Sequence, residues 1–367
     1  MKKSIKMCIS LLLLTLALCL TGCKNEAVSN ESTNNGEGEE VVNGEGEIED
    51  LEEEEVIPAN QNLLTGVCDL TEEAIGKRPV AVMVNNVTAA MPQYGVAQAD
   101  IIFEILVEGD QTRFMALYGD YTQVPEICSV RSCRKYFPIF SEGFDAVYVN
   151  WGMAEPIVPY VNSLNLTHYE GLRNTGGLFK RDQARLNAGY SLEHTGYFDG
   201  PKLAETMAKR NERTDLTEDK LGTAFVFNKL DEQLPANGDS CKNVEIEFGG
   251  VDASFEYNES SRTYLKNHNG KAQIDGKTGT QLEFTNLFIL ETDIWIDANG
   301  THKDFNWSGS ANSIGYYVSN GAVQKIHWMK DGVEEYLRFY DENGEELSIN
   351  RGKSYIAINY IGQATFE

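Results

Sequence analysis

The sequence predicts an α+β protein, in which an N-terminal α/β domain with a mixed sheet is followed by a β-rich C-terminal domain. Three observations support this prediction. Apolar runs of strand length alternate with helix candidates between residues 61 and 235. From residue 240 to 367, short β-branched and aromatic runs are separated by Asn-Gly and Asp-Gly turns. Of the 367 residues, 41% are apolar and 24% are charged, which is enough apolar material to build a buried core.

Residues 1–22 are predicted to be a lipoprotein signal peptide. A basic start, Met1 to Lys6, precedes an apolar run, Cys8 to Leu20, that is shorter than the about 20 residues that span a bilayer. The following Thr21-Gly22-Cys23 resembles a bacterial lipobox, where the chain is cut before the Cys and its thiol receives a lipid. The alternative is an ordinary secretory signal with an incidental Cys. The lipobox predicts lipidation of Cys23, palmitate-type acylation and anchoring at the extracytoplasmic face of the bacterial cell membrane.

Residues 23–60 are predicted to comprise the lipidated Cys and an acidic disordered tether. Between residues 24 and 57 there are 13 acidic residues, one Lys and no aromatic side chain, which gives a net charge of −12. A segment of this composition repels itself and cannot bury a core. The tether accounts for nearly half of the chain's net charge of −25. Residues 58–367 carry −16, from 27 basic and 43 acidic residues, which argues against nucleic acid as a partner.

The N-terminal domain, residues 61–235, is predicted from strand and helix patterns in chain order. Apolar runs predict strands, and Gly109-Asp110 predicts a hairpin between the second and the third of them. Two helices are expected, the second of which ends in the basic pair Lys209 and Arg210. The predicted strands are 77–86, 99–107, 113–118 and 144–151, and the predicted helices are 134–142 and 201–211.

The C-terminal domain, residues 240–367, is predicted to consist of short strands joined by tight turns. The strands are expected at 244–248, 254–257, 263–266, 284–291, 315–318, 322–328, 335–340 and 354–359. Turn signals stand at 269–270, 275–276, 299–300, 320–321, 331–332 and 343–344.

Four cysteines lie in the predicted body, at Cys68, Cys128, Cys133 and Cys241. An exported protein permits disulfides, and four cysteines allow three pairings; buried free thiols are the alternative, and both remain open. Because no Cys-X-X-Cys pair exists, a cysteine zinc site is not predicted. The sequence indicates no other metal site and no cofactor.

The densest group of charged residues runs from Glu104 to Arg134. Glu104 and Glu108 are four apart in a strand pattern and are therefore expected on the same face, and the hairpin returns Arg113 near Glu108. Arg131 and Arg134 follow at a strand-to-helix turn, where guanidinium groups and helix amides favour anions. The group predicts an anion-binding site in which the carboxylates orient the arginines or hold a cation. The alternative is an internal ion-pair network that stabilises the sheet.

A second charged group lies on a loop that enters a predicted helix. Arg181 and Asp182 follow Gly176-Gly177, and the loop is expected to line the same cleft as the first group. The alternative is a solvated loop with no part in a site.

Three short motifs occur in the order found in penicillin-binding serine acyl-enzymes. They are Ser132-Cys133-Arg134-Lys135, Ser163-Leu164-Asn165 and Lys277-Thr278-Gly279-Thr280. In that chemistry Ser132 would be the nucleophile and Lys135 would activate it. The short separation of the first two motifs and the hairpin context of the third argue against this interpretation.

Long ordered motifs stand after residue 65, at 78–86, 92–95, 99–101, 104, 108–109, 112–114, 130–132, 171–173, 179–182 and 338–344. Together these motifs resemble the YerB-like bacterial lipoproteins, a domain-of-unknown-function family. The resemblance implies a signal peptide, a tether, an α/β module and a β-rich module, and it supplies no settled activity. The sequence departs at Asn150-Trp151-Gly152, where the family pattern runs His-Ala-Gly-Gly, and Lys135 is outside the pattern.

Three classes of function remain open at this stage. The first is a lipid-anchored surface protein that binds an anionic cell-envelope component or a cell-wall enzyme through the Glu104–Arg134 group. The second is an enzyme that acts on cell-wall polymer or lipid-linked phosphate, with arginines on the phosphate and carboxylates on Mg²⁺. The third is an interaction protein whose β-rich domain docks a partner strand.

Overall fold

The computed structural model describes residues 55–164, 166–298 and 300–367. The predicted signal peptide, Cys23 and nearly all of the predicted tether lie outside these residues, as do Asn165 and Asn299 of two predicted motifs. Among the helices described, none is both long and apolar enough to cross a membrane.

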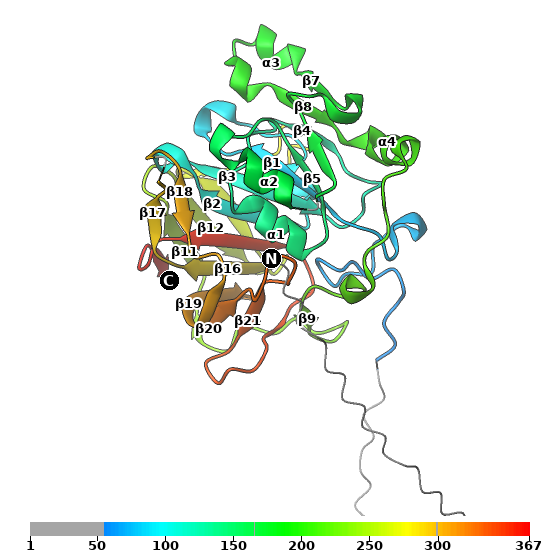
Figure 1. Ribbon diagram of the computed structural model, residues 1–367. Coiled ribbons are helices and arrows are strands. Elements are labelled where there is room, and N and C mark those ends of the chain that lie inside the picture. The colour runs from blue at the N-terminus through cyan, green and yellow to red at the C-terminus, as the bar shows by residue number, and fades with distance from the viewer. Residues whose placement is uncertain (1–54, 165, 299) are drawn as a thin grey trace, which may run out of the picture. The chain divides into compact units, whose positions relative to one another are not determined.

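A mixed sheet of 11 strands runs through the described part of the chain (Figure 1). Its strand order is β10-β20-β19-β16-β23-β2-β3-β1-β5-β6, with β21 beside β20. The sheet strands are β1 (Val80–Asn85), β2 (Ile101–Leu106), β3 (Thr112–Tyr118), β5 (Val147–Asn150), β6 (His168–Glu170), β10 (Asp239–Ser240), β16 (Asn286–Glu291), β19 (Gly309–Ser319), β20 (Ala322–Met329), β21 (Arg338–Tyr340) and β23 (Ser354–Asn359).

N-terminal and C-terminal segments share this sheet. β23 lies between β2 and β16 and is parallel to both, so that Tyr355 is in register with Ile102 on one side and with Leu287 on the other. The predicted boundary near residue 240 therefore does not separate two sheets. The described residues form one compact unit.

The central strands are buried on both faces, which explains why they read as continuous apolar runs. In β1, Val80, Val82 and Val84 face one hydrophobic cluster, whereas Ala81 and Met83 face the other. This alternation is the two-residue period of a strand. Each face therefore needs a cover, and the two covers differ.

A second sheet covers the face that includes Val82. Phe255 of this sheet lies 4.7 Å, between ring centroids, from Tyr355 of the large sheet. The sheet has the order β14-β13-β12-β11-β24, with β15 beside β13. Its strands are β11 (Asn243–Glu247), β12 (Asp252–Asn258), β13 (Thr263–His268), β14 (Lys271–Ala272), β15 (Glu283–Phe284) and β24 (Ala364–Phe366).

Helix α1 (Phe137–Gly143) covers the opposite face, where Phe140 packs against Phe103 of β2 at 5.2 Å between ring centroids. Pro138 stands in its first turn, where a backbone N–H has no acceptor within the helix. Because proline lacks this N–H, the position tolerates it. The other α-helices are α2 (Val158–Ser163), α3 (Gln183–Asn187) and α4 (Leu203–Arg210).

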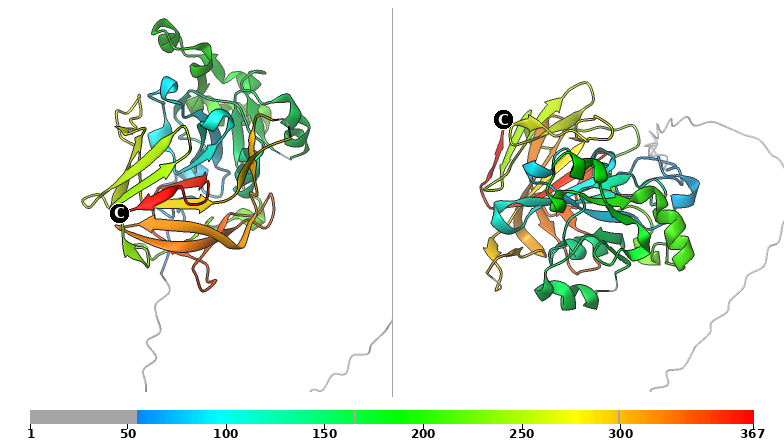
Figure 2. Two further views of the ribbon diagram at one scale, coloured as in Figure 1. Left: turned by 90° about the vertical axis from the view of Figure 1, so that its left-hand side faces the viewer. Right: turned by 90° about the horizontal axis from the view of Figure 1, so that it is seen from above.

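A three-stranded sheet with α3 forms an arm that projects from the body (Figures 1 and 2). Its strands are β4 (Glu126–Cys128), β7 (Phe179–Arg181) and β8 (Gly196–Asp199). Two further strand pairs are β9 (Val226–Phe227) with β22 (Ser348–Ile349), and β17 (Ile294–Ile296) with β18 (Lys303–Phe305).

The predicted fold class is confirmed, with a mixed sheet in the N-terminal part and a β-rich C-terminal region. Each of the four predicted N-terminal strands is present, and the predicted hairpin joins β2 to β3. The two predicted helices begin later than expected, at Phe137 and Leu203, and the strand expected at 335–340 is confined to Arg338–Tyr340. All four body cysteines are free thiols, and three of them are buried.

Candidate functional site

The candidate site lies where the parallel strands β1, β5 and β6 end. Because β1 is parallel to β5 but antiparallel to β3, the start of β3 meets the same edge of the sheet. The register places Arg113, at the start of β3, opposite Asn85, at the end of β1. Ligands of α/β proteins are commonly bound outside the carboxyl ends of parallel strands. We call Arg113, Arg131, Arg134 and Arg181 the arginine edge.

Glu108 joins two of these arginines. It follows β2 in a short 3₁₀ turn, Glu108–Asp110, and its carboxylate accepts hydrogen bonds at 2.8 Å from Arg113 Nη2 and from Arg134 Nε. Burial opposes its ionisation, but the two guanidinium groups outweigh burial and lower the pKa of Glu108 to about 2. Burial and the charge of Arg134 lower the pKa of Arg113 to about 10. The predicted approach of Arg113 to Glu108 therefore occurs.

Arg113 and Arg134 are almost inaccessible, with 4% and 8% of their side chains exposed. Their remaining donors bind backbone carbonyls: Arg113 Nη1 donates to Ser132 O at 2.7 Å, and Arg134 Nη1 donates to Cys133 O at 2.6 Å. These two arginines hold the 108–110 turn and the 131–134 segment together. They add positive charge to the edge, but their side chains are almost closed to solvent.

Arg131 is the more exposed member next to them, with 22% of its side chain accessible. Its backbone N–H donates to Met83 O of β1, and its carbonyl accepts from the N–H of Trp151 after β5. The guanidinium group pairs with Glu193 at 3.1 Å, and Glu193 is itself 55% exposed. Arg131 therefore sits across the ends of β1 and β5, beside a carboxylate that solvent can reach.

Arg181 stacks on Trp151, with its guanidinium carbon 4.1 Å from the ring centroid. It donates to Leu192 O at 2.8 Å. Burial and the like charge of Arg131 lower the pKa of Arg181 from its usual value. Gly171 and Gly196 lie so close to the Trp151 ring that an added Cβ would approach it to 2.5 Å and 3.1 Å. The backbone at these two glycines thus packs directly against the indole ring of Trp151.

Two buried N–H donors of this edge have no acceptor among the described residues, namely Arg131 Nε and Trp151 Nε1. An unpaired buried donor costs about 1–3 kcal/mol, and an acceptor oxygen that reached either N–H would recover that cost. Arg131 and Trp151 are also joined through their backbones. The chemistry of the edge therefore suits a ligand that carries anionic oxygens.

Asp182 was predicted to belong to the site, and the structure places it at the start of α3. Its side chain accepts the backbone N–H of Arg185 at 3.0 Å and caps α3. Arg185 is buried, and its guanidinium group donates to the carbonyls of Ala90, Pro92 and His194. The arm is therefore attached to the body partly through Arg185. Asp182 and Arg185 stabilise the segment that carries Arg181.

The structure does not bring Glu104 to the arginine edge. Glu104 and Lys266 of β13 are both 0% exposed, and Lys266 Nζ lies 3.2 Å from Glu104 Oε2. Tyr355 donates to the same oxygen at 2.7 Å. Asn86 and Thr112 each donate to Glu104 Oε1 at 2.7 Å. The expectation that Glu104 and Glu108 share a face is wrong, because Glu108 lies beyond the end of β2.

The three serine acyl-enzyme motifs are explained locally. Lys135 pairs with Asp304 at 2.9 Å, and Lys277 pairs with Glu126 at 2.7 Å. Ser163 Oγ donates to Tyr160 O at 2.6 Å. Asn165 lies outside the described residues. Both lysines are engaged by carboxylates, so Lys135 is not placed to activate Ser132.

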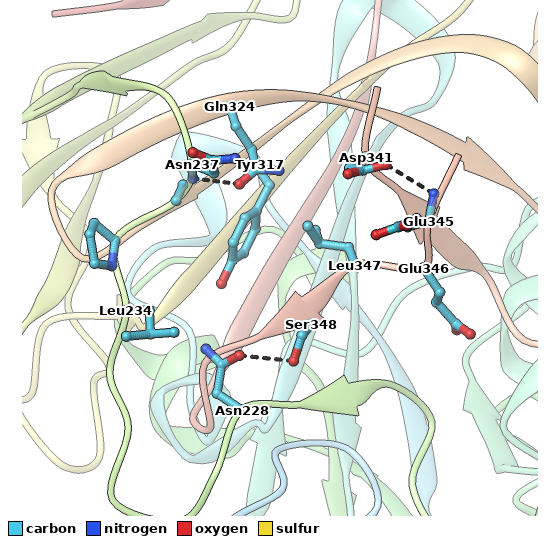
Figure 3. Close-up of a pocket in the computed structure, with 12 residues that line it drawn as sticks. Asn228, Leu234, Asn237, Tyr317, Gln324, Asp341, Glu345, Glu346, Leu347 and Ser348 are labelled. Carbon is cyan, nitrogen blue, oxygen red and sulfur yellow. Dashed lines mark hydrogen bonds between the residues drawn. The ribbon is translucent and has the colours of Figure 1, made fainter. Parts of the chain in front are cut away.

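A hollow of about 270 Å³ lies on another part of the body, between the segment after β9 and the β21–β22 loop (Figure 3). Tyr317 and Leu234 line it, and Asp341 and Glu346 stand at one side. The Asp341 carboxylate accepts hydrogen bonds from the backbone N–H groups of Asn343 and Glu345. None of the predicted site residues lines this hollow. Within the described ranges, no group of three or more His, Cys, Asp or Glu is placed to hold a metal ion.

Comparison with known proteins identifies the family. The model of the N-terminal domain of the "protein of unknown function (DUF3048)" matches residues 64–213, and the model of its C-terminal domain matches residues 244–356. The chain belongs to the DUF3048 family. A relative, "Putative lipoprotein YerB" of Bacillus subtilis (strain 168), is 30% identical over 272 residues, which are 72% of this chain and 76% of the relative.

The fold of this DUF3048 protein is similar to the crystal structure of the YerB protein from Bacillus subtilis. The TM-score is 0.69 at 25% identity, and the match covers 83% of this chain and 98% of the YerB chain. The predicted resemblance to YerB-like proteins is therefore confirmed.

Two residues of the candidate site, Trp151 and Glu193, were absent from the sequence prediction, and so was Lys266, the buried partner of Glu104. Trp151 lies in the segment 150–152, where the sequence departs from the family pattern. This departure was the signal that could have pointed to Trp151. Glu193 and Lys266 come from segments far from their partners in the chain, and only the fold brings them together.

Proposed function

We propose that the protein is a surface lipoprotein, anchored through a lipid on Cys23, that binds an anionic component of the cell envelope at the arginine edge. The relative named as a lipoprotein, the basic and apolar N-terminal segment and the lipobox-like Cys23 support the anchor. The body then stands outside the cytoplasmic membrane, where phosphate- and carboxylate-bearing polymers are the available anions.

The binding proposal rests on one observation. Arg181 stacks on Trp151, Arg131 is joined to Trp151 through the backbone, and Arg131 Nε and Trp151 Nε1 have no acceptor in the part of the chain that the structure describes. Four arginines at the edge are countered by Glu108 and by the exposed Glu193. Residues 58–367 carry −16 overall, so this is a local reversal of the charge of the body. Guanidinium groups match phosphate oxygens in a bidentate way, which favours a phosphate over a simple halide.

Binding is better supported than catalysis. An enzyme that used Mg²⁺ would need free carboxylates, but Glu104 is engaged by Lys266 and Glu108 is engaged by two arginines. The two carboxylates that the sequence offered for a cation are therefore charge partners inside the protein.

The experiment measures binding of soluble poly(glycerol phosphate) to the mature chain by titration calorimetry at two salt concentrations. The double substitution Arg131→Ala with Arg181→Ala is expected to weaken binding about tenfold or more, because each charge-assisted hydrogen bond contributes about 1.5–3 kcal/mol. Higher salt should weaken the wild type more than the variant.

Lys325→Ala is the matched control. Lys325 is 44% exposed, and its closest carboxylate oxygen, on Glu342, is 3.9 Å away, so its loss should leave the affinity within about twofold. Equal affinities for the wild type and the double arginine variant would refute the proposal. So would an equal loss in the Lys325 variant, because binding would then follow net charge alone.

A further inference from the structure

Two exposed leucines flank the arginine edge. Leu172, after β6, is 71% exposed, and Leu192, at the start of a 3₁₀ turn, is 59% exposed. Exposed apolar side chains on a protein surface are common singly. A pair beside two arginines and a tryptophan is a different case, because it gives one small area both anion-binding and apolar character.

Both leucines are held in place by hydrogen bonds of their own backbone. Glu170 accepts the N–H of Leu172 at 2.9 Å and the N–H of Arg173 at 3.0 Å. Leu172 Cδ1 lies 3.5 Å from the position that a Cβ on Gly152 would take, directly after Trp151. The carbonyl of Leu192 accepts from Arg181 at 2.8 Å and from Thr195 Oγ1 at 2.7 Å.

The geometry therefore fixes each leucine next to a different part of the cationic site. Leu192 carries the carbonyl that holds Arg181, and the next residue is Glu193, the partner of Arg131. Leu172 approaches the backbone that follows the indole of Trp151. A ligand with its anionic oxygens on Arg131 and Arg181 would have apolar surface on the flanks of that contact.

We propose that the ligand of the arginine edge is a lipid-linked phosphate, bound one molecule at a time. The phosphate contacts Arg131 and Arg181, and the first carbons of the hydrocarbon chain contact Leu172, Leu192 and the exposed part of Trp151. This inference rests on the proposed function and names the class of ligand for the same site.

The location and charge of the protein favour this ligand over a membrane surface. The tether predicted from the sequence runs over 32 residues, from Cys23 to the first described residue. A flexible chain of that length has an r.m.s. reach of roughly 30 Å, which would keep the body of a protein anchored at Cys23 within reach of the membrane face. The net charge of −16 on residues 58–367 opposes flat adhesion to an anionic bilayer. Recognition of one lipid phosphate needs only the local site.

The test titrates the mature chain with ethyl, butyl and octyl phosphate, each below its micelle concentration, and with octyl glucoside as a neutral amphiphile. The affinity of the wild type should rise with chain length, by about tenfold or more from ethyl to octyl phosphate, because each methylene that leaves water makes binding more favourable. Leu172→Ser with Leu192→Ser should flatten this dependence on chain length.

Ile361→Ser is the matched control, since Ile361 is 58% exposed and lies outside the arginine edge. It should keep the wild-type dependence on chain length. Equal affinities for ethyl and octyl phosphate, or a dependence that survives in the double leucine variant, would overturn this inference while leaving the proposed anion binding intact. If octyl glucoside binds as tightly as octyl phosphate, or if Arg131→Ala with Arg181→Ala leaves ethyl phosphate binding unchanged, the proposed function itself fails.

Discussion

Replacement of Lys266 by Met should destabilise the protein strongly. Lys266 and Glu104 are fully buried and 3.2 Å apart, so the substitution leaves a carboxylate in the interior without its countercharge. Breaking a buried pair in this way costs about 3–5 kcal/mol. Asn86, Thr112 and Tyr355 still donate to Glu104, which places the expected loss near the lower limit, at about 3 kcal/mol.

The assay is urea unfolding at neutral pH, with single and double substitutions. Lys266→Met with Glu104→Gln removes both charges and should be less damaging than the sum of the single changes, with a coupling energy of about 2 kcal/mol. Lys242 and Glu259 provide the control pair, because they are 2.5 Å apart but 60% and 72% exposed. Lys242→Met should change the free energy of unfolding far less than Lys266→Met does, because solvent screens an exposed pair. A loss in Lys266→Met no larger than in this control would refute the reasoning.

Three further predictions concern the thiols, the acid response and the arm. In the mature native protein, only Cys68 of the body should react with a thiol reagent at pH 8. Cys68 is partly exposed, whereas burial raises the pKa of Cys128 and Cys133 to about 12. Labelling of a second body cysteine before unfolding would contradict this prediction. Because the pKa of Glu108 is lowered in the folded state, its ionised carboxylate stabilises the fold above pH 4.5, and this stabilisation is lost as the pH falls towards 2. Glu108→Gln should therefore reduce the change in unfolding free energy across that pH range. An unchanged dependence of stability on pH would argue against the ion pairs. Asp182→Ala should lower the free energy of unfolding by about 1 kcal/mol through loss of the α3 cap, as measured by thermal unfolding. A variant that kept full stability but lost binding would show instead that Asp182 touches the ligand.

The strands were predictable because both faces of the large sheet are buried. Runs such as 80–84 are apolar throughout, and the Asn320-Gly321 turn between β19 and β20 has the positive φ values, 48° and 81°, that this dipeptide favours. The pairing of β23 with β2 was not predictable, because it joins segments far apart in the chain and neither strand carries a local signal for its neighbour.

The candidate site was predictable in part. Glu108 and Arg113 are joined by a short hairpin, so their contact follows from local sequence. Glu104 was assigned to the wrong surroundings because strand periodicity gives the face of a residue but not what covers that face. The cover is the second sheet, which brings Lys266 to Glu104. Trp151 was missed as the platform for Arg181 because the contact depends on how the arm is placed on the body.

The most direct test of the central claim is the affinity of the mature protein for poly(glycerol phosphate) with and without Arg131 and Arg181. The account predicts that the double alanine variant binds about tenfold more weakly or worse, while Lys325→Ala binds like the wild type. The account is contradicted if the double variant, folded as judged by its unfolding curve, binds the polymer as tightly as the wild type.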